Sequence, residues 1–276
     1  MIEQMVGFFV SGFIYPGLPW TKLLLGVGLA IAFGAFWFAP YWTPIFKKPW
    51  AWAVLVGGAI VSWIAVSFVQ IPLQLWTGQA LSHFWSQEIL MSSLLFAGIP
   101  QILLSGLVQE GSKLIPVVVY WWRKGKNIDP KLGLIIGAVA GLGLGIFEAL
   151  WVHNTVFSAG WSWELVQAGG LTALAPFWER FFTVAFHTAS SALAGYGLAK
   201  GWGWQFYLIA SFLHAFLNYS VIPLQMGLMT AIHLEIFVAV WALLVTGGAL
   251  WLRWRKTPKL AEPEISAAQI SDIESG

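Results

Sequence analysis

The sequence contains no cysteine and little charge. Without cysteine, the chain has no disulfide, no thiolate metal site, no iron–sulfur cluster and no cysteine nucleophile. Charged residues make up 9% of the 276 residues, whereas soluble domains carry about 25%. Because 58% of the residues are hydrophobic, most of the surface must face lipid. The net charge of +2 offers no basic surface for nucleic acid, so we predict no such partner.

Long apolar runs dominate the chain. A helix needs about 20 mostly apolar residues to cross a membrane. Seven runs meet this length: 18–39, 51–69, 89–120, 132–152, 174–199, 204–222 and 228–252. An eighth run, 5–15, is too short to cross alone, and we expect it to be interfacial or re-entrant. The 89–120 run is too long for one straight helix and contains Pro100 and Pro116, which predicts tilt or a kink. The sequence thus predicts an all-α polytopic transmembrane bundle of seven, or at most eight, helices.

Lys and Arg occupy alternate connections between these runs. They occur at 47–48, 123–131, 200 and 253–259, and they are missing from the connections 70–88, 153–173 and 223–227. Since cytoplasmic connections retain positive charge, the pattern predicts an N-terminus outside and a C-terminus in the cytoplasm. No Lys or Arg precedes Lys22, which argues against a cleaved secretory signal. We expect one integral membrane domain over residues 1–256 and a disordered cytoplasmic tail over 257–276.

Several polar side chains fall inside the predicted membrane runs. They are Glu110, Lys113, Glu148, Glu179, Arg180, His187, His214 and Asn218. A charged residue at mid-depth costs about 2.5–3.5 kcal/mol on insertion scales, so each needs a partner or a function. At about 1.5 Å of rise per residue, Glu110, His187 and His214 all lie about 15–18 Å from their cytoplasmic helix ends. Three residues from three helices therefore share one depth.

Glu148 lies about a turn and a half further outward by the same calculation. Its helix carries Gly137, Gly141 and Gly145 at four-residue spacing. Such a strip of small residues lets a neighbouring helix approach closely, which could bring Glu148 to the other polar residues. Considered alone, Glu110 and Lys113 could instead be a structural ion pair, because they are one helical turn apart.

The polar residues match the needs of hydrolysis inside a membrane. Two imidazoles and one carboxylate are a usual ligand set for catalytic zinc, and His187, His214 and Glu148 supply such a set. The second carboxylate, Glu110, is then available as general base, although the sequence equally allows Glu110 to be a ligand. Without metal, a Glu–His pair could activate water while Asn218 stabilises the oxyanion.

Other intramembrane hydrolase patterns are missing from the sequence. It contains no His-Glu-x-x-His motif. Aspartate occurs only at Asp129 and Asp272, outside the predicted membrane runs, which excludes an intramembrane aspartyl dyad. No Gly-x-Ser-Gly element precedes a membrane histidine either. Glutamate and histidine remain as the candidate catalytic residues.

The order of these residues resembles a known family. Gln109-Glu110-Gly111-Ser112-Lys113, Phe147-Glu148, Arg180, Phe186-His187 and His214-Ala-Phe-Leu-Asn218 follow one another along residues 100–225. They resemble the motifs Glu-Glu-x-x-Lys, Phe-x-x-x-Glu and His-x-x-x-Asp/Asn of the YhfC and PrsW intramembrane proteases. This group is related to the CAAX prenyl proteases and the Abi proteins. Gln109 replaces the first Glu and Leu144 replaces the Phe of those motifs, which makes the YhfC-like branch the closer likeness.

The resemblance implies an intramembrane metalloprotease of a prokaryotic plasma membrane. By position, Glu110, Glu148, His187 and His214 would form the catalytic or metal site. Lys113, Arg180 and Asn218 would support it. The implied cofactor is Zn²⁺, and the implied partners are membrane lipid and a transmembrane or membrane-proximal peptide. Two other functions stay open at this point, a proton-coupled transporter and a non-catalytic scaffold or immunity protein of the same fold.

Overall fold

The structure is a computed structural model that describes residues 2–256. The predicted tail, 257–276, lies outside the described residues. Within the described part, the chain forms helices and no strand. The helices are α1 (Ile2–Ser11), α2 (Trp20–Phe38), η1 (Ala39–Tyr41), η2 (Pro44–Lys47), α3 (Pro49–Ala65), η3 (Val66–Gln70), α4 (Ile71–Phe84), α5 (Gln87–Ser92), α6 (Leu94–Ala97), α7 (Ile99–Arg123), α8 (Pro130–Ser158), α9 (Trp163–Gly169), η4 (Gly170–Leu174), α10 (Ala175–Ala199), α11 (Gly203–Tyr219), α12 (Val221–Gln225) and α13 (Ala231–Trp254).

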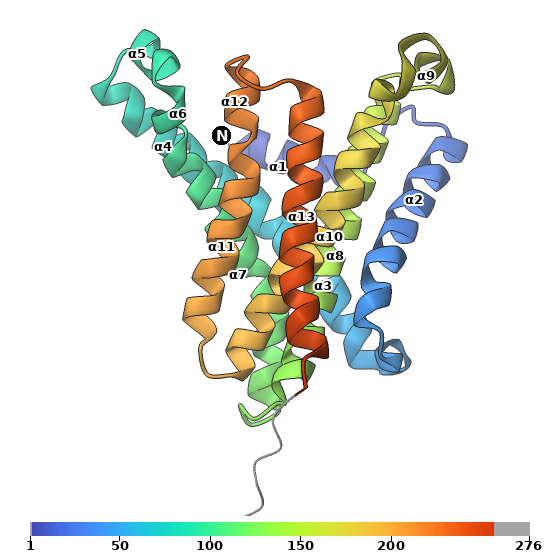
Figure 1. The fold of residues 1–276 in the computed structure, drawn as a ribbon. Coiled ribbons are helices and arrows are strands. Elements are labelled where there is room, and N and C mark those ends of the chain that lie inside the picture. The colour runs from blue at the N-terminus through green and yellow to red at the C-terminus, as the bar shows by residue number, and fades with distance from the viewer. Residues whose placement is uncertain (1, 257–276) are drawn as a thin grey trace, which may run out of the picture.

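Six helical stretches of the described chain are long and apolar enough to cross a membrane. They are Trp20–Tyr41, Pro49–Phe84, Leu94–Arg123, Pro130–Ser158, Gly203–Gln225 and Ala231–Trp254. Helix α10 is also 25 residues long, but Glu179, Arg180 and His187 make it less apolar. It packs between α8 and α13 in the same bundle (Figure 1). The predicted polytopic helical bundle is confirmed, and six stretches together with α10 agree with the expected seven.

The connection expected at 70–88 is mostly helical. Helix α3 continues through the π-helical segment η3 into α4, which ends at Phe84. The glutamines of this region suggest a polar connection, but they bond to α7: Gln74 Nε2 donates to the Gln101 carbonyl over 2.9 Å. A helix can keep such residues when a neighbouring helix satisfies them.

The long run 89–120 is broken rather than bent. It divides at Ser93 and Gly98 into α5, α6 and α7. Pro100 lies in the first turn of α7, where a backbone N–H has no helical partner in any case. Glu110 and Lys113 therefore lie on the single helix α7.

Helices α8 and α10 form the central seam of the bundle. A Cβ atom added to Gly137 would lie 2.1 Å from the Ser191 carbonyl oxygen, and one added to Gly141 would lie 2.0 Å from that of His187. Only glycine permits such a close backbone approach. The predicted glycine strip thus packs directly against the helix turn that carries His187.

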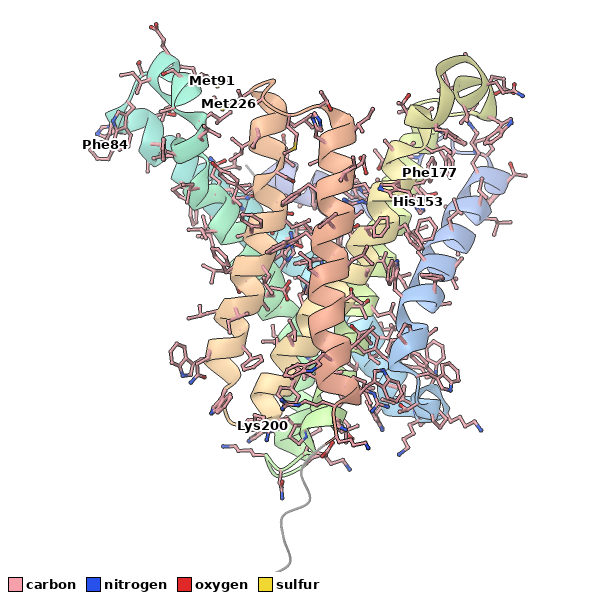
Figure 2. All side chains as sticks on the ribbon, viewed as in Figure 1. Phe84, Met91, His153, Phe177, Lys200 and Met226 are labelled. Atoms are coloured by element: carbon pink, nitrogen blue, oxygen red, sulfur yellow. The ribbon has the colours of Figure 1, made fainter. Side chains whose placement is uncertain are left out.

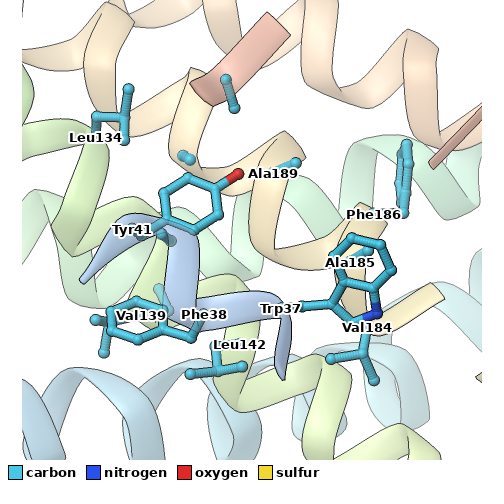
Figure 3. Close-up of a cluster of buried hydrophobic side chains, with 14 of the residues drawn as sticks. Trp37, Phe38, Tyr41, Leu134, Val139, Leu142, Val184, Ala185, Phe186 and Ala189 are labelled. Carbon is cyan, nitrogen blue, oxygen red and sulfur yellow. The ribbon is translucent and has the colours of Figure 1, made fainter. Parts of the chain in front are cut away.

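An apolar cluster packs around this seam. Trp37, Phe38 and Tyr41, at the end of α2 and in η1, pack with Leu134 and Val139 of α8 and with residues of α10 (Figure 3). Tyr41 is fully buried. The cluster joins α2 and η1 to the α8–α10 pair.

Helix α1 has 10 residues, too few to cross a membrane. It lies against the α3–η3 junction, where Trp63 Nε1 donates to the Phe9 carbonyl over 3.0 Å. The structure agrees with the expectation that the 5–15 run does not span the membrane alone.

The basic connections gather at one end of the bundle. Lys200, between α10 and α11, lies at this end, whereas Met91 and Met226 lie at the other (Figure 2). Lys131 and Arg255 are close to each other here, because Lys131 Nζ donates to the Arg255 carbonyl over 2.9 Å. The assignment of this end to the cytoplasm remains a prediction.

Candidate active site

Helix α7 supplies a buried ion pair. Glu110 and Lys113 are one turn apart and completely inaccessible to solvent. Lys113 Nζ donates to Glu110 Oε1 over 2.6 Å. Removing two charges from water costs several kcal/mol per ion, so the pair requires further polar partners.

Those partners come from α10. Ser190 Oγ donates to Glu110 Oε1 over 3.0 Å. Lys113 Nζ also lies 3.3 Å from Ser190 Oγ and 3.2 Å from His187 Nδ1. Because His187 and Ser190 are three residues apart, one helix face presents both to α7.

Helix α11 adds His214 to the same carboxylate. His214 Nδ1 lies 2.7 Å from Glu110 Oε1, and its ring centroid lies 5.1 Å from that of His187. An ionised carboxylate only accepts hydrogen bonds, so Nδ1 of His214 carries the proton. Glu110 Oε1 therefore meets three donors, whereas Oε2 is buried and has no hydrogen-bond partner among the described residues.

Helix α8 places Glu148 on the other side of His187. Glu148 Oε2 lies 2.7 Å from His187 Nε2, and Oε1 lies 3.3 Å from Arg180 Nη1. Arg180 also pairs with its neighbour Glu179. The close α8–α10 approach at Gly141 accounts for this contact, although the rise along the helix suggested a vertical offset for Glu148. With its Nε2 proton donated to Glu148, neutral His187 directs the lone pair of Nδ1 toward α7.

Asn218 lies one turn beyond His214. Its Nδ2 donates to Ser105 Oγ of α7 over 3.0 Å. No hydrogen bond joins it to the two histidines or the two glutamates within the described chain. Asn218 is thus a neighbour of the ion-pair cluster and not a member of it.

A cavity of about 70 Å³ adjoins these residues. Its wall includes Glu148, Arg180, His187, His214 and Asn218, but not Glu110. A volume of this size holds a few water molecules. The Glu148 side chain is 24% exposed, whereas that of Glu110 is 0% exposed. Glu148 is thus in contact with the cavity, whereas Glu110 is buried and does not line it.

Glu110, His187 and His214 form a group suited to a metal ion. Each offers one ligand atom, and these atoms lie within 4.8 Å of one another. The predicted metal set contained Glu148 in place of Glu110. The donor types fit zinc, and the unpartnered Glu110 Oε2 is a carboxylate oxygen that a metal would satisfy.

Two polar residues near the site were missed by sequence reasoning. Ser190 bonds to Glu110, and its position three residues after His187 on a helix could have indicated this role. Glu235 also lies within a predicted membrane run, on α13, and is half-buried. It belongs to no ion pair of the described chain, although Trp178 Nε1 donates to its carbonyl.

The fold and site together define an integral membrane protein with a buried glutamate–histidine centre, as expected for intramembrane hydrolysis. A family model for PrsW family intramembrane metalloproteases matches residues 47–245, which is more than half of the chain. The chain belongs to this family and is an intramembrane endopeptidase. No curated protein and no solved structure matches it.

The match runs from the start of α3 into α13 and thus covers α7, α8, α10 and α11, the helices that supply the site residues. It confirms the predicted resemblance to PrsW proteases and favours the protease over a transporter or a non-catalytic scaffold. It does not distinguish the YhfC-like branch, which stays a prediction.

Proposed function

We propose that Glu110, His187 and His214 hold one catalytic zinc ion and that Glu148 is the general base. The observation that carries this proposal is the unequal use of the Glu110 oxygens. Oε1 meets Lys113, Ser190 and His214, while Oε2 is buried without a partner. A buried carboxylate oxygen without a donor is costly, and a metal ion beside two imidazoles would remove that cost.

Zinc, when bound, would polarise a peptide carbonyl and favour the ionised form of water. The protein supplies the proton transfers. Glu148 reaches the cavity, and its hydrogen bonds to His187 and Arg180 fix its orientation. It can accept a proton from water and donate it to the leaving amine. His187, held by Glu148 through Nε2, keeps Nδ1 as its donor atom for the metal.

Lys113 must move for this arrangement to form. Its Nζ lies 3.2 Å from His187 Nδ1, the atom that would face the metal. The lysine side chain is flexible and already contacts Ser190 and Glu110 Oε1. A small rotation toward Ser190 frees His187 and retains the pairing of Lys113 with Glu110.

The substrate is a transmembrane or membrane-proximal peptide in an extended conformation. A helix with side chains is about 10–12 Å across, so a cavity of about 70 Å³ cannot hold one. The scissile segment must therefore unwind before it reaches Glu148. The side-chain amide of Asn218 lines the cavity and can donate to the developing oxyanion. The chain would act in a prokaryotic plasma membrane with its C-terminus in the cytoplasm.

Metal analysis of detergent-purified protein tests this proposal. We expect one zinc per chain in the wild type and none in His214→Gln. The matched control is His153→Gln, because His153 is another buried histidine and lies outside the site. New membrane-protein N-termini in cells expressing each variant report cleavage, and we expect them with the control but not with His214→Gln. Equal metal content in all three proteins would refute the proposed ligand set.

A further inference from the structure

A second, larger cavity lies at the end of the bundle that carries Lys200 (Figure 2). Its volume is about 460 Å³. Three helix ends meet there: the start of α8, the end of α10 and the end of α13. Its polar lining residues are Asp129, Lys131, Tyr196, Lys200, Arg255 and Lys256. The active site shares none of these residues.

The lining is strongly cationic. It contains four basic side chains and one carboxylate, whereas the whole chain has a net charge of only +2. The carboxylate of Asp129 caps helix α8, because its Oδ1 accepts hydrogen bonds from the backbone N–H groups of Lys131 and Leu132. Among the described residues, no carboxylate lies within 4.0 Å of the four basic groups. Within the described chain, the lining therefore keeps an excess of positive charge, because its four basic groups outnumber the one carboxylate.

Arg255 is held in place on the cavity wall. Its guanidinium lies 5.6 Å from the centre of the Tyr196 ring and 5.1 Å from that of the Trp251 ring. It also donates to the hydroxyl of Tyr196. Lys131 Nζ, in the first turn of α8, donates to the Arg255 carbonyl at the end of α13. An arginine fixed in this way loses less conformational entropy when it binds an anion.

We propose that this cavity binds the phosphate group of an anionic phospholipid. Trp251 and Trp254 at the end of α13 are exposed, as expected for residues at a membrane surface. Basic pockets between helix ends at the cytoplasmic surface suit anionic headgroups in particular. The ligand holds α8, α10 and α13 together and thereby stabilises the helices that carry Glu148 and His187.

Lipid binding to matched lysine variants tests this assignment. Full-length protein in nanodiscs of phosphatidylcholine is titrated with phosphatidylglycerol, and bound lipid is counted by native mass spectrometry. The test variant is Lys200→Gln with Lys256→Gln. The control is Lys124→Gln with Lys126→Gln, which removes the same charge from the exposed α7–α8 connection, outside the cavity. Thermal unfolding in phosphatidylcholine alone verifies that both variants fold.

Each lysine should contribute about fivefold to the affinity, so the cavity variant should bind phosphatidylglycerol about 25-fold more weakly. The control should change by less than about twofold, since screened surface charges contribute little. Equal losses in both variants, or no loss in either, would overturn the site. A further titration with inorganic phosphate distinguishes the two sources of the anion. If inorganic phosphate does not displace the lipid, the result supports a phospholipid as the ligand. Displacement by millimolar phosphate would instead identify free phosphate as the ligand and overturn the assignment to a lipid.

Discussion

The two carboxylates of the site differ in almost every physical respect. Glu110 is 0% exposed and is held through one oxygen by Lys113, Ser190 and His214. Glu148 is 24% exposed, contacts the cavity and shares its two oxygens between His187 and Arg180. A ligand needs a fixed position and a dry surrounding, whereas a general base must reach water. The difference in surroundings therefore supports the proposed roles, with Glu110 as ligand and Glu148 as base, which the sequence left open.

The largest effect is expected from Glu148→Gln. Loss of a general base slows catalysis by about 10²–10⁴-fold, while the amide can still bond to His187. The cleavage products, measured as new membrane-protein N-termini in cells, should disappear, and the bound zinc should stay. Retained cleavage would show that Glu148 is not the base, and the two carboxylates would then not have the roles proposed for them.

Lys113→Met tests the proposed role of the buried carboxylate, Glu110. Removing one partner of a buried ion pair costs about 3–5 kcal/mol. Glu110 would keep its charge beside His214 and Ser190, and a bound zinc ion would then compensate for it. We expect a lower thermal unfolding temperature without zinc and a larger zinc-dependent increase than in the wild type. An equal increase in both proteins would show that Glu110 is not a ligand.

The α8–α10 seam sets the distance between Glu148 and His187, and Gly141→Ala perturbs it. The added Cβ would lie 2.0 Å from the His187 carbonyl oxygen, and overpacking of this kind costs about 1–3 kcal/mol. Gly28→Ala is the matched control, since nothing lies within 4 Å of its added Cβ. Unfolding temperature and cleavage should fall for Gly141→Ala alone. Unchanged cleavage would mean that the seam does not position the site.

The smallest effect is expected at Ser190. Ser190→Ala removes one hydrogen bond to Glu110 Oε1, and residues that orient a metal ligand typically contribute 10- to 100-fold in affinity. Ser191→Ala is an adjacent control, because Ser191 is equally buried and its Oγ has no partner among the described residues. Cobalt titration, followed by the visible spectrum, should show about tenfold weaker binding for Ser190→Ala only. Equal affinities in the two variants would remove Ser190 from the support of Glu110.

The fold follows from the sequence because the solvent is lipid. A long apolar run such as the one containing Gly141 has few alternatives to a membrane helix. Polar residues interrupt that simple pattern. Gln70 of η3 and Gln74 of α4 suggest a connection, yet both lie in helical segments and form hydrogen bonds with α7. Hydrogen bonds between helices cannot be predicted from the composition of a single stretch of sequence.

The sequence also indicated which residues meet at the candidate site, but it did not indicate how they contact one another. The depth calculation placed Glu110, His187 and His214 at one level, and the structure brings the same three together. Which carboxylate joins them depends on side-chain rotamers and on the 2.0 Å backbone approach at Gly141. The role of Ser190 likewise depends on how α10 is rotated against α7. These features arise from packing, and hydrophobic periodicity does not contain them.

The most direct measurement of the central claim is the zinc content of Glu110→Gln and Glu148→Gln, purified side by side. Each variant removes one negative charge and changes the side-chain volume very little. The account predicts that Glu110→Gln loses the metal and Glu148→Gln retains about one zinc per chain. Metal retained by Glu110→Gln and lost by Glu148→Gln would contradict the account and restore Glu148 as the third ligand.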